Sequence, residues 1–147
     1  MKSTVLMSAR GHFMLSIYDN GTLIEVIDEP NLIVLDSKRA LSHAIAGDSA
    51  DSWAISKIGF GSNNTLPTPN DSVLSTDAYI KPLNGSKIRG TIVRFDFTLD
   101  KNEANGKPIN EFGLLTGNGT LFARKIRQQP LSKTNSIEFI GTWTIVF

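Results

Sequence analysis

The sequence predicts a mainly β fold: an antiparallel β-sandwich, or a barrel-like form of it, of about eight strands with one short α-helix near residues 36–46. Short segments of alternating apolar and polar residues recur between groups of turn-forming residues. Four Asn-Gly dipeptides occur, and Asn-Gly favours tight hairpins because both turn positions need positive φ. Strand-like and helix-like segments do not alternate, so a doubly wound parallel sheet is not expected.

The first predicted hairpin joins residues 12–18 to residues 22–27 through Asn20-Gly21. A two-residue turn at Asn20-Gly21 brings apolar side chains together on one face, as a half-buried hairpin requires. The pairs expected from this register are Ile17 with Ile24 and Leu15 with Val26. The polar residues 28–31 are expected to interrupt the pattern before the next element.

A short buried strand is predicted at residues 32–35, followed by a helix over residues 36–46. Apolar residues recur there at helical spacing. Asp36 or Ser37 is the expected N-cap, because their side-chain oxygens accept hydrogen bonds from free N–H groups of the first turn. Gly47 is expected to end the helix in a left-handed conformation.

The rest of the chain reads as further strands separated by polar loops. The expected strands are residues 53–60, 77–83, 91–99, 109–115, 120–126 and a last strand that carries Ile137, Phe139, Trp143, Ile145 and Phe147 on one face. Three long polar segments between strands are candidate contact surfaces: 61–72, 100–108 and 127–135.

Length and composition indicate one β-rich domain over residues 1–147, with residues 1–11 as a flexible or partner-binding arm. The net charge of +1 offers no overall field for nucleic acid or an anionic membrane, so neither is an expected partner. The absence of cysteine excludes disulfides, thiolate metal sites and cysteine nucleophiles. No signal peptide or membrane-spanning segment is evident, so synthesis in the cytoplasm is expected.

Candidate chemistry is sparse, and the protein is predicted not to be an enzyme, with no catalytic residue, cofactor or metal site. Ser42 and His43 are neighbours on the predicted helix and point about 100° apart, so they do not form a nucleophile and base pair. Glu103 and Glu111 could be imagined as a glycosidase pair, but nothing in the sequence sets their separation.

The one concentration of basic residues is Arg124, Lys125 and Arg127. On a strand, Arg124 and Lys125 point to opposite faces, which divides the positive charge. Binding of single-stranded nucleic acid would need aromatic residues interleaved with these charges on one surface. A solvated or interfacial strand edge is therefore the favoured interpretation.

Two parts of the chain resemble a family of small bacteriophage virion proteins encoded among tail, baseplate and fibre genes. In the first, the Asn31-Leu32 strand leads through the helix to Gly59-Phe60-Gly61 and then to a Thr/Pro/Asn/Asp loop that closes on Leu74. The second also resembles the collar-type domains at the base of phage tail fibres. Its matching motifs are Glu111-Phe112-Gly113-Leu114, Gly117-Asn118-Gly119, Leu121-Phe122-Ala123-Arg124 and Thr142-Trp143-Thr144.

The resemblance implies a non-enzymatic structural protein of the tail, baseplate or fibre-attachment region of a virion. Its expected partners are other phage structural proteins and copies of itself, as a trimer or hexamer. Two alternatives remain open: a head-decoration protein, and a carbohydrate- or receptor-binding β-sandwich that uses an aromatic residue such as Trp53, Tyr79 or Trp143. The candidate interface residues are Asn63, Asn64, Thr65, Asn102, Asn105, Arg124, Lys125 and Arg127.

Overall fold

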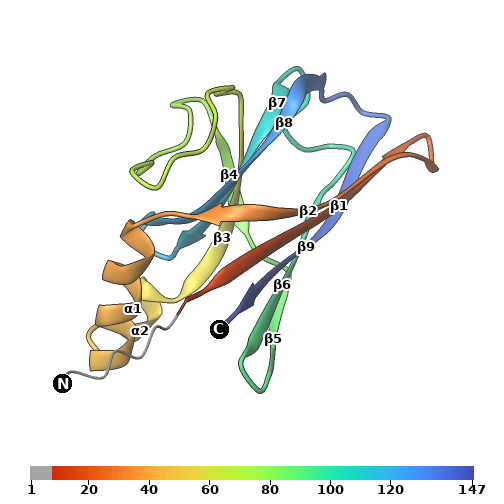
Figure 1. Ribbon diagram of the computed structural model, residues 1–147. Helices are drawn as coiled ribbons and strands as arrows, with labels where there is room; N and C mark the ends of the chain where they lie inside the picture. The colour runs from red at the N-terminus through yellow and green to blue at the C-terminus, as the bar shows by residue number, and fades with distance from the viewer. Residues whose placement is uncertain (1–7) are drawn as a thin grey trace.

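The computed structural model describes residues 8–147 as a mainly β protein with one curled antiparallel sheet and two short helices (Figure 1). The strands are β1 (Arg10–Asp19), β2 (Thr22–Ile33), β3 (Ile55–Gly61), β4 (Tyr79–Pro82), β5 (Gly85–Arg89), β6 (Ile92–Leu99), β7 (Pro108–Thr116), β8 (Leu121–Ser132) and β9 (Ile137–Val146). The helices are α1 (Asp36–Ala46) and α2 (Ala50–Trp53). The predicted fold class is confirmed.

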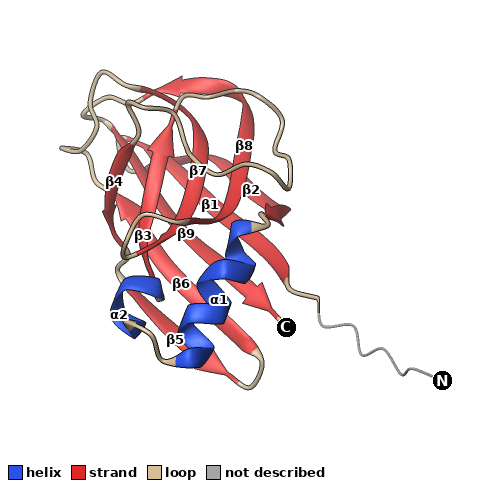
Figure 2. Ribbon diagram, turned by 90° about the vertical axis from the view of Figure 1, so that its left-hand side faces the viewer, coloured by secondary structure: helices blue, strands red, loops and turns tan. Residues whose placement is uncertain are grey.

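The sheet has nine strands in the order β4-β3-β7-β8-β2-β1-β9-β6-β5. Strand β2 pairs with β1 along almost its whole length but with β8 only at Leu32 and Ile33. The sheet therefore curls at β2 into a half-barrel, and its two halves face each other (Figure 2). Helices α1 and α2 lie together at one end of this curled sheet.

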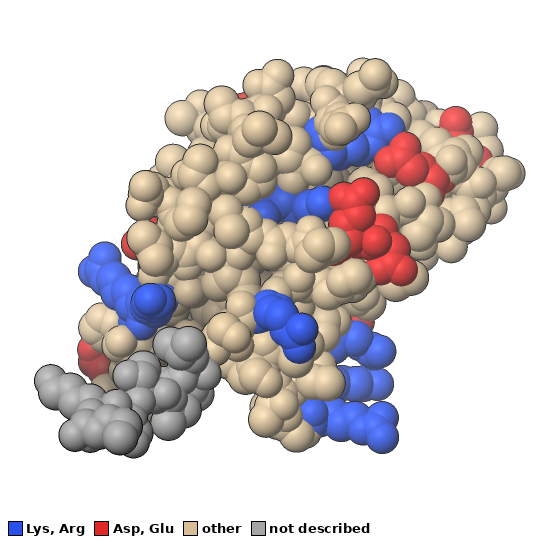
Figure 3. All heavy atoms as spheres, in the orientation of Figure 1, with Lys and Arg blue, Asp and Glu red and all other residues tan. Residues whose placement is uncertain are grey.

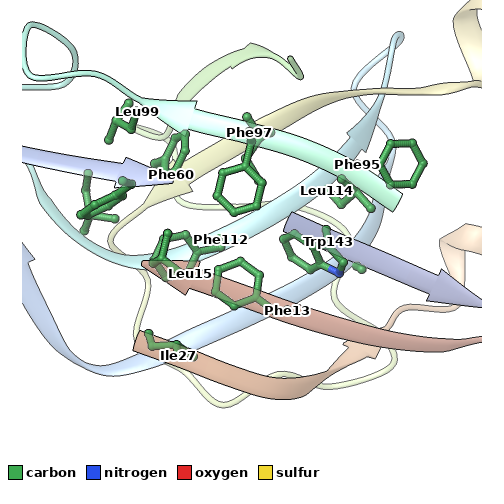
Figure 4. Close-up of a cluster of buried hydrophobic side chains, with 14 of the residues drawn as sticks. Phe13, Leu15, Ile27, Phe60, Phe95, Phe97, Leu99, Phe112, Leu114 and Trp143 are labelled. Carbon is green, nitrogen blue, oxygen red and sulfur yellow. The ribbon is translucent and has the colours of Figure 1, made fainter. Parts of the chain in front are cut away.

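Aromatic side chains from both halves of the sheet fill the core (Figure 4). Phe13 of β1 lies 4.9 Å, between ring centroids, from Phe112 of β7. Phe60 of β3 lies 6.1 Å from Phe97 of β6. Trp143 is fully buried, and its indole N–H donates to Asn31 Oδ1 at 2.9 Å. Buried aromatic pairs add directional contacts to the hydrophobic effect, so these rings bind the two halves together.

Two elements were not predicted, β5 and α2. All five residues of β5 are exposed, so this edge strand has no alternation of burial to indicate it. Helix α2 has four residues and occupies the start of the strand predicted at 53–60, which begins at Ile55 instead.

The first hairpin turns at Asn20-Gly21 as predicted, with φ of 49° and 80°. The predicted pairing beyond the turn is wrong by one residue. Leu15 lies opposite Ile27, and Ile17 lies opposite Glu25, because a β-bulge leaves Ile24 as an extra residue in β2. Ile24 and Val26 are consequently half-exposed, whereas Ile27 is buried in the core.

Two predicted interruptions are also wrong. Residues 28–31 belong to β2, and the strand expected at 32–35 is its end. Pro30 is tolerated because β2 has only β1 as a paired neighbour at that residue, so no ladder hydrogen bond on the other side is lost. Strand β8 continues through residues 127–132, so most of the loop expected at 127–135 is strand.

Helix α1 spans the predicted residues, but neither Asp36 nor Ser37 caps it. Leu35 occupies the N-cap without a side-chain hydrogen bond, and Ser37 is buried. Gly47 ends the helix in the left-handed conformation, as predicted. Of the expected arm, residues 1–7 lie outside the described residues, and Arg10 and Gly11 are part of β1.

Candidate functional site

The segment 62–78, called the clamp loop below, lies on the outer face of β3 and β7. Three glycines form the floor beneath it: Gly59, Gly61 and Gly113. Gly59 and Gly113 are paired directly across the two strands. A Cβ atom at Gly113 would lie 2.7 Å from both methyl carbons of Leu74, and one at Gly59 would also overlap Leu74. The glycines therefore allow Leu74 to pack flat on the sheet.

Glu111 of β7 binds the backbone of the clamp loop. Its Oε1 accepts hydrogen bonds from the N–H of Ser75 at 2.9 Å and from the N–H of Asn63 at 3.4 Å. A Cβ atom at Gly61 would lie 2.6 Å from Ser75 Oγ and would also overlap Glu111 Oε1. Glycine at this position thus leaves room for the carboxylate and for the loop that it holds.

Arg124 of β8 also holds the clamp loop in place. We call the residues that fix the loop on the sheet the clamp: Asp71, Leu74, Glu111 and Arg124. The Nε of Arg124 donates to Glu111 Oε2 at 2.8 Å, and its two terminal nitrogens donate to Asp71 Oδ2 at 2.9 Å and to the carbonyl of Asn63 at 3.3 Å. Arg124 is 1% exposed and Glu111 is 0% exposed. Burial of an ion pair is costly unless further hydrogen bonds satisfy both groups. Here those bonds come from the clamp loop, so the pair and the loop stabilise each other.

Asp71 connects the clamp to the interior of the loop. Both the N–H and the hydroxyl of Thr68 donate to its carboxylate at 2.9 Å. Burial raises the pKa of Asp71, but the hydrogen bonds from Thr68 and Arg124 outweigh this effect and hold the pKa below its ordinary value. Asp71 is therefore charged at neutral pH, as its contact with Arg124 requires.

A groove lies beside the clamp loop, where β2 and β8 diverge on the N-terminal side of Leu32. Its first part has a volume of about 450 Å³ and lies between Leu66 and Pro67 of the loop and residues 29–32 of β2. Its second part, of about 400 Å³, continues along β2 from Glu29 to Glu25. We call these two parts the β2–β8 groove.

Two ion pairs cross the β2–β8 groove. Lys125 contacts Glu29, and Arg127 binds both carboxylate oxygens of Glu25 at 2.7 and 2.8 Å. The hydrogen bond from Arg127 lowers the pKa of Glu25, and the same bond raises the pKa of Arg127. The two unpaired strand edges are thus bridged by side chains in place of backbone hydrogen bonds.

The structure brings together most of the predicted interface residues. Asn63, Asn64 and Thr65 lie in the clamp loop, and Lys125 and Arg127 lie along the groove beside it. Arg124 requires a correction, because its side chain is buried beneath the loop and is not at a solvated edge.

The other two predicted interface residues lie in the loop between β6 and β7, away from the clamp. Asn105 Oδ1 accepts a hydrogen bond from the buried ammonium of Lys133 at 3.0 Å. Asn102 is exposed and makes no side-chain hydrogen bond within the described residues.

The residues considered for catalysis have structural contacts instead. Glu111 is bound to Arg124, and Glu103 accepts hydrogen bonds from Tyr79 at 2.8 Å and Lys81 at 2.6 Å. The ring of His43 stacks on Trp53 with a centroid distance of 4.0 Å and contacts Asp48 rather than Ser42.

Of the three aromatic residues considered for sugar binding, Trp143 is buried in the core. Trp53 is stacked on His43, and the hydroxyl of Tyr79 is bound to Glu103. Residues 8–147 contain no group of three or more His, Cys, Asp or Glu side chains arranged to hold a metal ion.

The sequence did not predict that Asp71, Leu74 and Glu111 hold the loop 62–78 on the sheet. The sequence feature that could have indicated this contact is the set of strand glycines Gly59, Gly61 and Gly113. A glycine in a strand can mark the close approach of another part of the chain. Comparison of the chain with protein-family models, with curated proteins and with solved structures finds no match. Within the described residues, none of the helices has the length and apolar character needed to cross a membrane.

Proposed function

We propose that this protein is a non-enzymatic structural subunit of a bacteriophage virion, located in the tail at the baseplate or at the point of fibre attachment. It acts through protein–protein contacts made by the clamp loop and the adjoining β2–β8 groove, and it associates with copies of itself. It is assembled into particles in the host cytoplasm.

The observation that carries this proposal is the place of the motif residues in the structure. The motifs that resemble phage tail proteins supply the floor and the charged pair of the clamp: Gly59, Gly61, Leu74, Glu111, Gly113 and Arg124. Residues from two distant parts of the sequence therefore serve one purpose, which is to hold the clamp loop in a fixed shape. The motif residues thus belong to one structural unit, and this supports the proposal.

A loop of fixed shape suits a contact surface. An ordered loop loses little conformational freedom on binding, so more of its contact energy contributes to affinity. Leu66 is 82% exposed and lines the β2–β8 groove, which places an apolar side chain among polar ones at the surface. Apolar groups surrounded by a polar rim are typical of protein–protein interfaces.

Complementation of a phage that lacks this gene tests the proposal. Wild-type protein and a Leu66→Asp variant are supplied from a plasmid, and purified particles are analysed by quantitative mass spectrometry and immunogold electron microscopy. We expect wild-type protein in the particles, labelled at the tail, and at least tenfold less of the variant. Ile92→Asp is the matched control, because Ile92 is also partly exposed but lies on β6 in the other half of the sheet.

Wild-type protein missing from mature particles would contradict the proposal. Label on the capsid would support the head-decoration alternative instead. Equal incorporation of Leu66→Asp and Ile92→Asp would show that the clamp loop is not the contact surface.

A further inference from the structure

A group of exposed apolar side chains occupies the outer face of the β1–β2 hairpin and the neighbouring β9. Its members, called the tip patch, are Met14, Leu23, Ile24, Val26 and Ile140, each between 42% and 51% exposed. Val26, Ser16 and Ile140 lie in one row across three strands, and Leu23 lies opposite Tyr18 in a row nearer the turn. Several exposed apolar residues gathered on one sheet face are typical of interaction sites.

The β-bulge in β2 adds Ile24 and Val26 to this patch. Without the extra residue at Ile24, the alternation would place Ile24 and Val26 opposite the buried residues Ile17 and Leu15. With the bulge, both face solvent, and Ile27 takes the core position. The hairpin end is also held in place, because the N–H of Asn20 donates to the carbonyl of Ser136 at 2.9 Å. The tip patch is thus a fixed feature of the hairpin.

A second apolar surface lies at the opposite end of the protein, where α1 and α2 approach the sheet (Figure 1). A groove of about 280 Å³ opens there between the helices and the ends of β5, β6 and β9. We call it the helix groove, and its lining includes Ala40, Leu41, Ala44, Trp53, Phe95 and Ile145. Two apolar residues near the groove are largely exposed to solvent: Ile45 of α1 at 85% and Ile88 of β5 at 77%.

Opposite charges surround the two surfaces. Asp19, Asp28 and Glu138 lie around the tip patch, and Glu25 and Glu29 lie beside it in pairs with Arg127 and Lys125. Around the helix groove are Lys38 and Arg39 on α1 and Lys87 and Arg89 on β5, together with the acidic Asp36 and Asp51. Figure 3 shows acidic side chains gathered toward the hairpin and basic ones around the lower end of the sheet.

We propose that the tip patch of one copy of this protein docks in the helix groove of a second copy. Apolar side chains of the tip fill the groove, and the acidic residues around the tip meet the basic residues around the groove. Complementary charge favours this pairing over tip with tip or groove with groove, since both of those bring like charges together. The inference rests on the self-association in the proposed function and names its two surfaces.

Because the two surfaces are different and lie at opposite ends, the contact is head-to-tail. Such a contact leaves one tip and one groove free on every dimer, so it continues until a ring closes or a filament forms. Ring closure would yield the trimer or hexamer that the proposed function expects.

The test uses one variant for each surface. Ile24→Asp places a charge in the tip patch, and Ala44→Glu places bulk and negative charge in the helix groove, where the acidic tip would be repelled. Ile80→Asp and Ser72→Glu are the matched controls, because Ile80 on β4 is exposed to the same degree as Ile24, Ser72 is exposed in the clamp loop, and both lie outside the tip patch and the helix groove. Val26→Asp and Ser86→Glu repeat the test if a first variant does not fold, as judged by circular dichroism.

Sedimentation velocity gives the association state of each protein alone and of equimolar mixtures. We expect wild-type protein and both controls to form oligomers whose size increases with concentration. Ile24→Asp and Ala44→Glu alone should be monomers, with association weakened at least tenfold. Their mixture should form a heterodimer and nothing larger, because only the groove of the first variant and the tip of the second remain intact.

Four results would overturn the inference. If wild-type protein is monomeric at all concentrations, no such contact exists. If only one of the two variants becomes monomeric, the contact joins two copies of the same surface, and if both do but their mixture forms no heterodimer, tip and groove do not bind each other. If neither variant reduces oligomer size, copies associate through another surface, and the proposed self-association then stands while this contact does not.

Discussion

The carboxylate of Glu111 lies 2.8 Å from Nε of Arg124, and both side chains are buried beneath a loop that lies far from either residue in the sequence. The two residues come from adjacent strands of the sheet, so the sheet provides a rigid base for the pair. Each group uses its remaining hydrogen-bonding atoms on the clamp loop. The pair therefore fixes the conformation of the clamp loop by attaching it to the rigid sheet.

Arg124→Met tests this relationship. Removal of the guanidinium leaves the buried Glu111 carboxyl without its cationic partner, so we expect a loss of about 3–5 kcal/mol in the free energy of unfolding. The double variant Glu111→Met with Arg124→Met should be more stable than Arg124→Met, because no buried carboxyl remains without its partner. Urea unfolding gives the free energy of unfolding of the wild type, of Arg124→Met and of the double variant. A loss below about 1 kcal/mol for Arg124→Met alone would show that the pair is not buried in solution.

The glycine floor leads to a second expectation. In Gly113→Ala the added methyl group would meet Leu74, which must move off the sheet and take the clamp loop with it. We expect a loss of about 1–3 kcal/mol, the usual cost of overpacking. Leu74→Ala should reduce the effect of Gly113→Ala in the double variant, because it removes the overlapping methyl carbons. Thermal unfolding of the four proteins gives the coupling energy, and additive losses would contradict the close contact.

Strands with one buried face were predictable from the sequence, and edges were not. Residues 91–99 alternate strictly, and β6 and β9 lie where the alternation indicated because the core selects apolar residues at every second position. Strand β5 has no buried face, so no such selection acts on it. The bulge at Ile24 was not predictable, because an extra residue in a strand carries no residue type of its own.

The clamp shows a different limit. An arginine on a strand is usually solvated, and Arg124 was interpreted in that way. Its burial depends on Glu111 and on Asp71, which are brought close only when the clamp loop folds over β3 and β7. No local pattern identifies the partners of such a contact. The glycines at 59, 61 and 113 indicate only where another segment approaches the sheet.

Acid should weaken the clamp. The pKa of Asp71 in the folded protein is below its ordinary value, since hydrogen bonds from Thr68 and Arg124 outweigh the effect of burial. A carboxylate with a lowered pKa contributes stability that is present above its unfolded pKa and lost as the pH falls through its folded pKa. Asp71 therefore contributes fully above about pH 4 and progressively less below it.

Asp71→Asn provides the comparison. At pH 7 we expect this variant to be less stable than wild type by about 1.5–3 kcal/mol, the value of a hydrogen bond to a charged group. The difference should shrink as the pH falls below about 4, because wild-type Asp71 then becomes neutral as well. Urea unfolding between pH 2.5 and 7, in the range set by the ordinary carboxyl pKa, measures it. A difference independent of pH would show that the charge of Asp71 has no part in the clamp.

Asn102 and Asn105 lie in the same loop, and we expect their substitution to affect stability differently. Asn105 accepts a hydrogen bond from Lys133 at 3.0 Å and donates one to the carbonyl of Lys101 at 3.0 Å. We expect Asn105→Ala to cost about 1–3 kcal/mol, because the buried ammonium loses an acceptor. Asn102→Ala should change stability by less than about 0.5 kcal/mol, as expected for a surface position. Equal losses in thermal unfolding would contradict this distinction.

Asn110 of β7 is the reverse case, a buried polar side chain whose removal should help. It is 0% exposed, and neither Oδ1 nor Nδ2 has a hydrogen-bond partner among residues 8–147. It lies between the pairs Ile109–Leu131 and Glu111–Ile126, opposite a part of β8 that departs from the ladder. A buried amide without partners costs about 1–3 kcal/mol. Leucine has the same branching without polar atoms, so we expect Asn110→Leu to raise the free energy of unfolding by about 1 kcal/mol or more.

Asn31→Leu is the matched control for Asn110→Leu, because Asn31 Oδ1 accepts a hydrogen bond from the indole of the buried Trp143 at 2.9 Å. Loss of that acceptor leaves the indole N–H unsatisfied, so the same change of residue type should lower stability by about 1–3 kcal/mol. Urea unfolding of both variants checks the opposite signs. A loss of stability in Asn110→Leu similar to that in Asn31→Leu would mean that the Asn110 amide is hydrogen-bonded in solution.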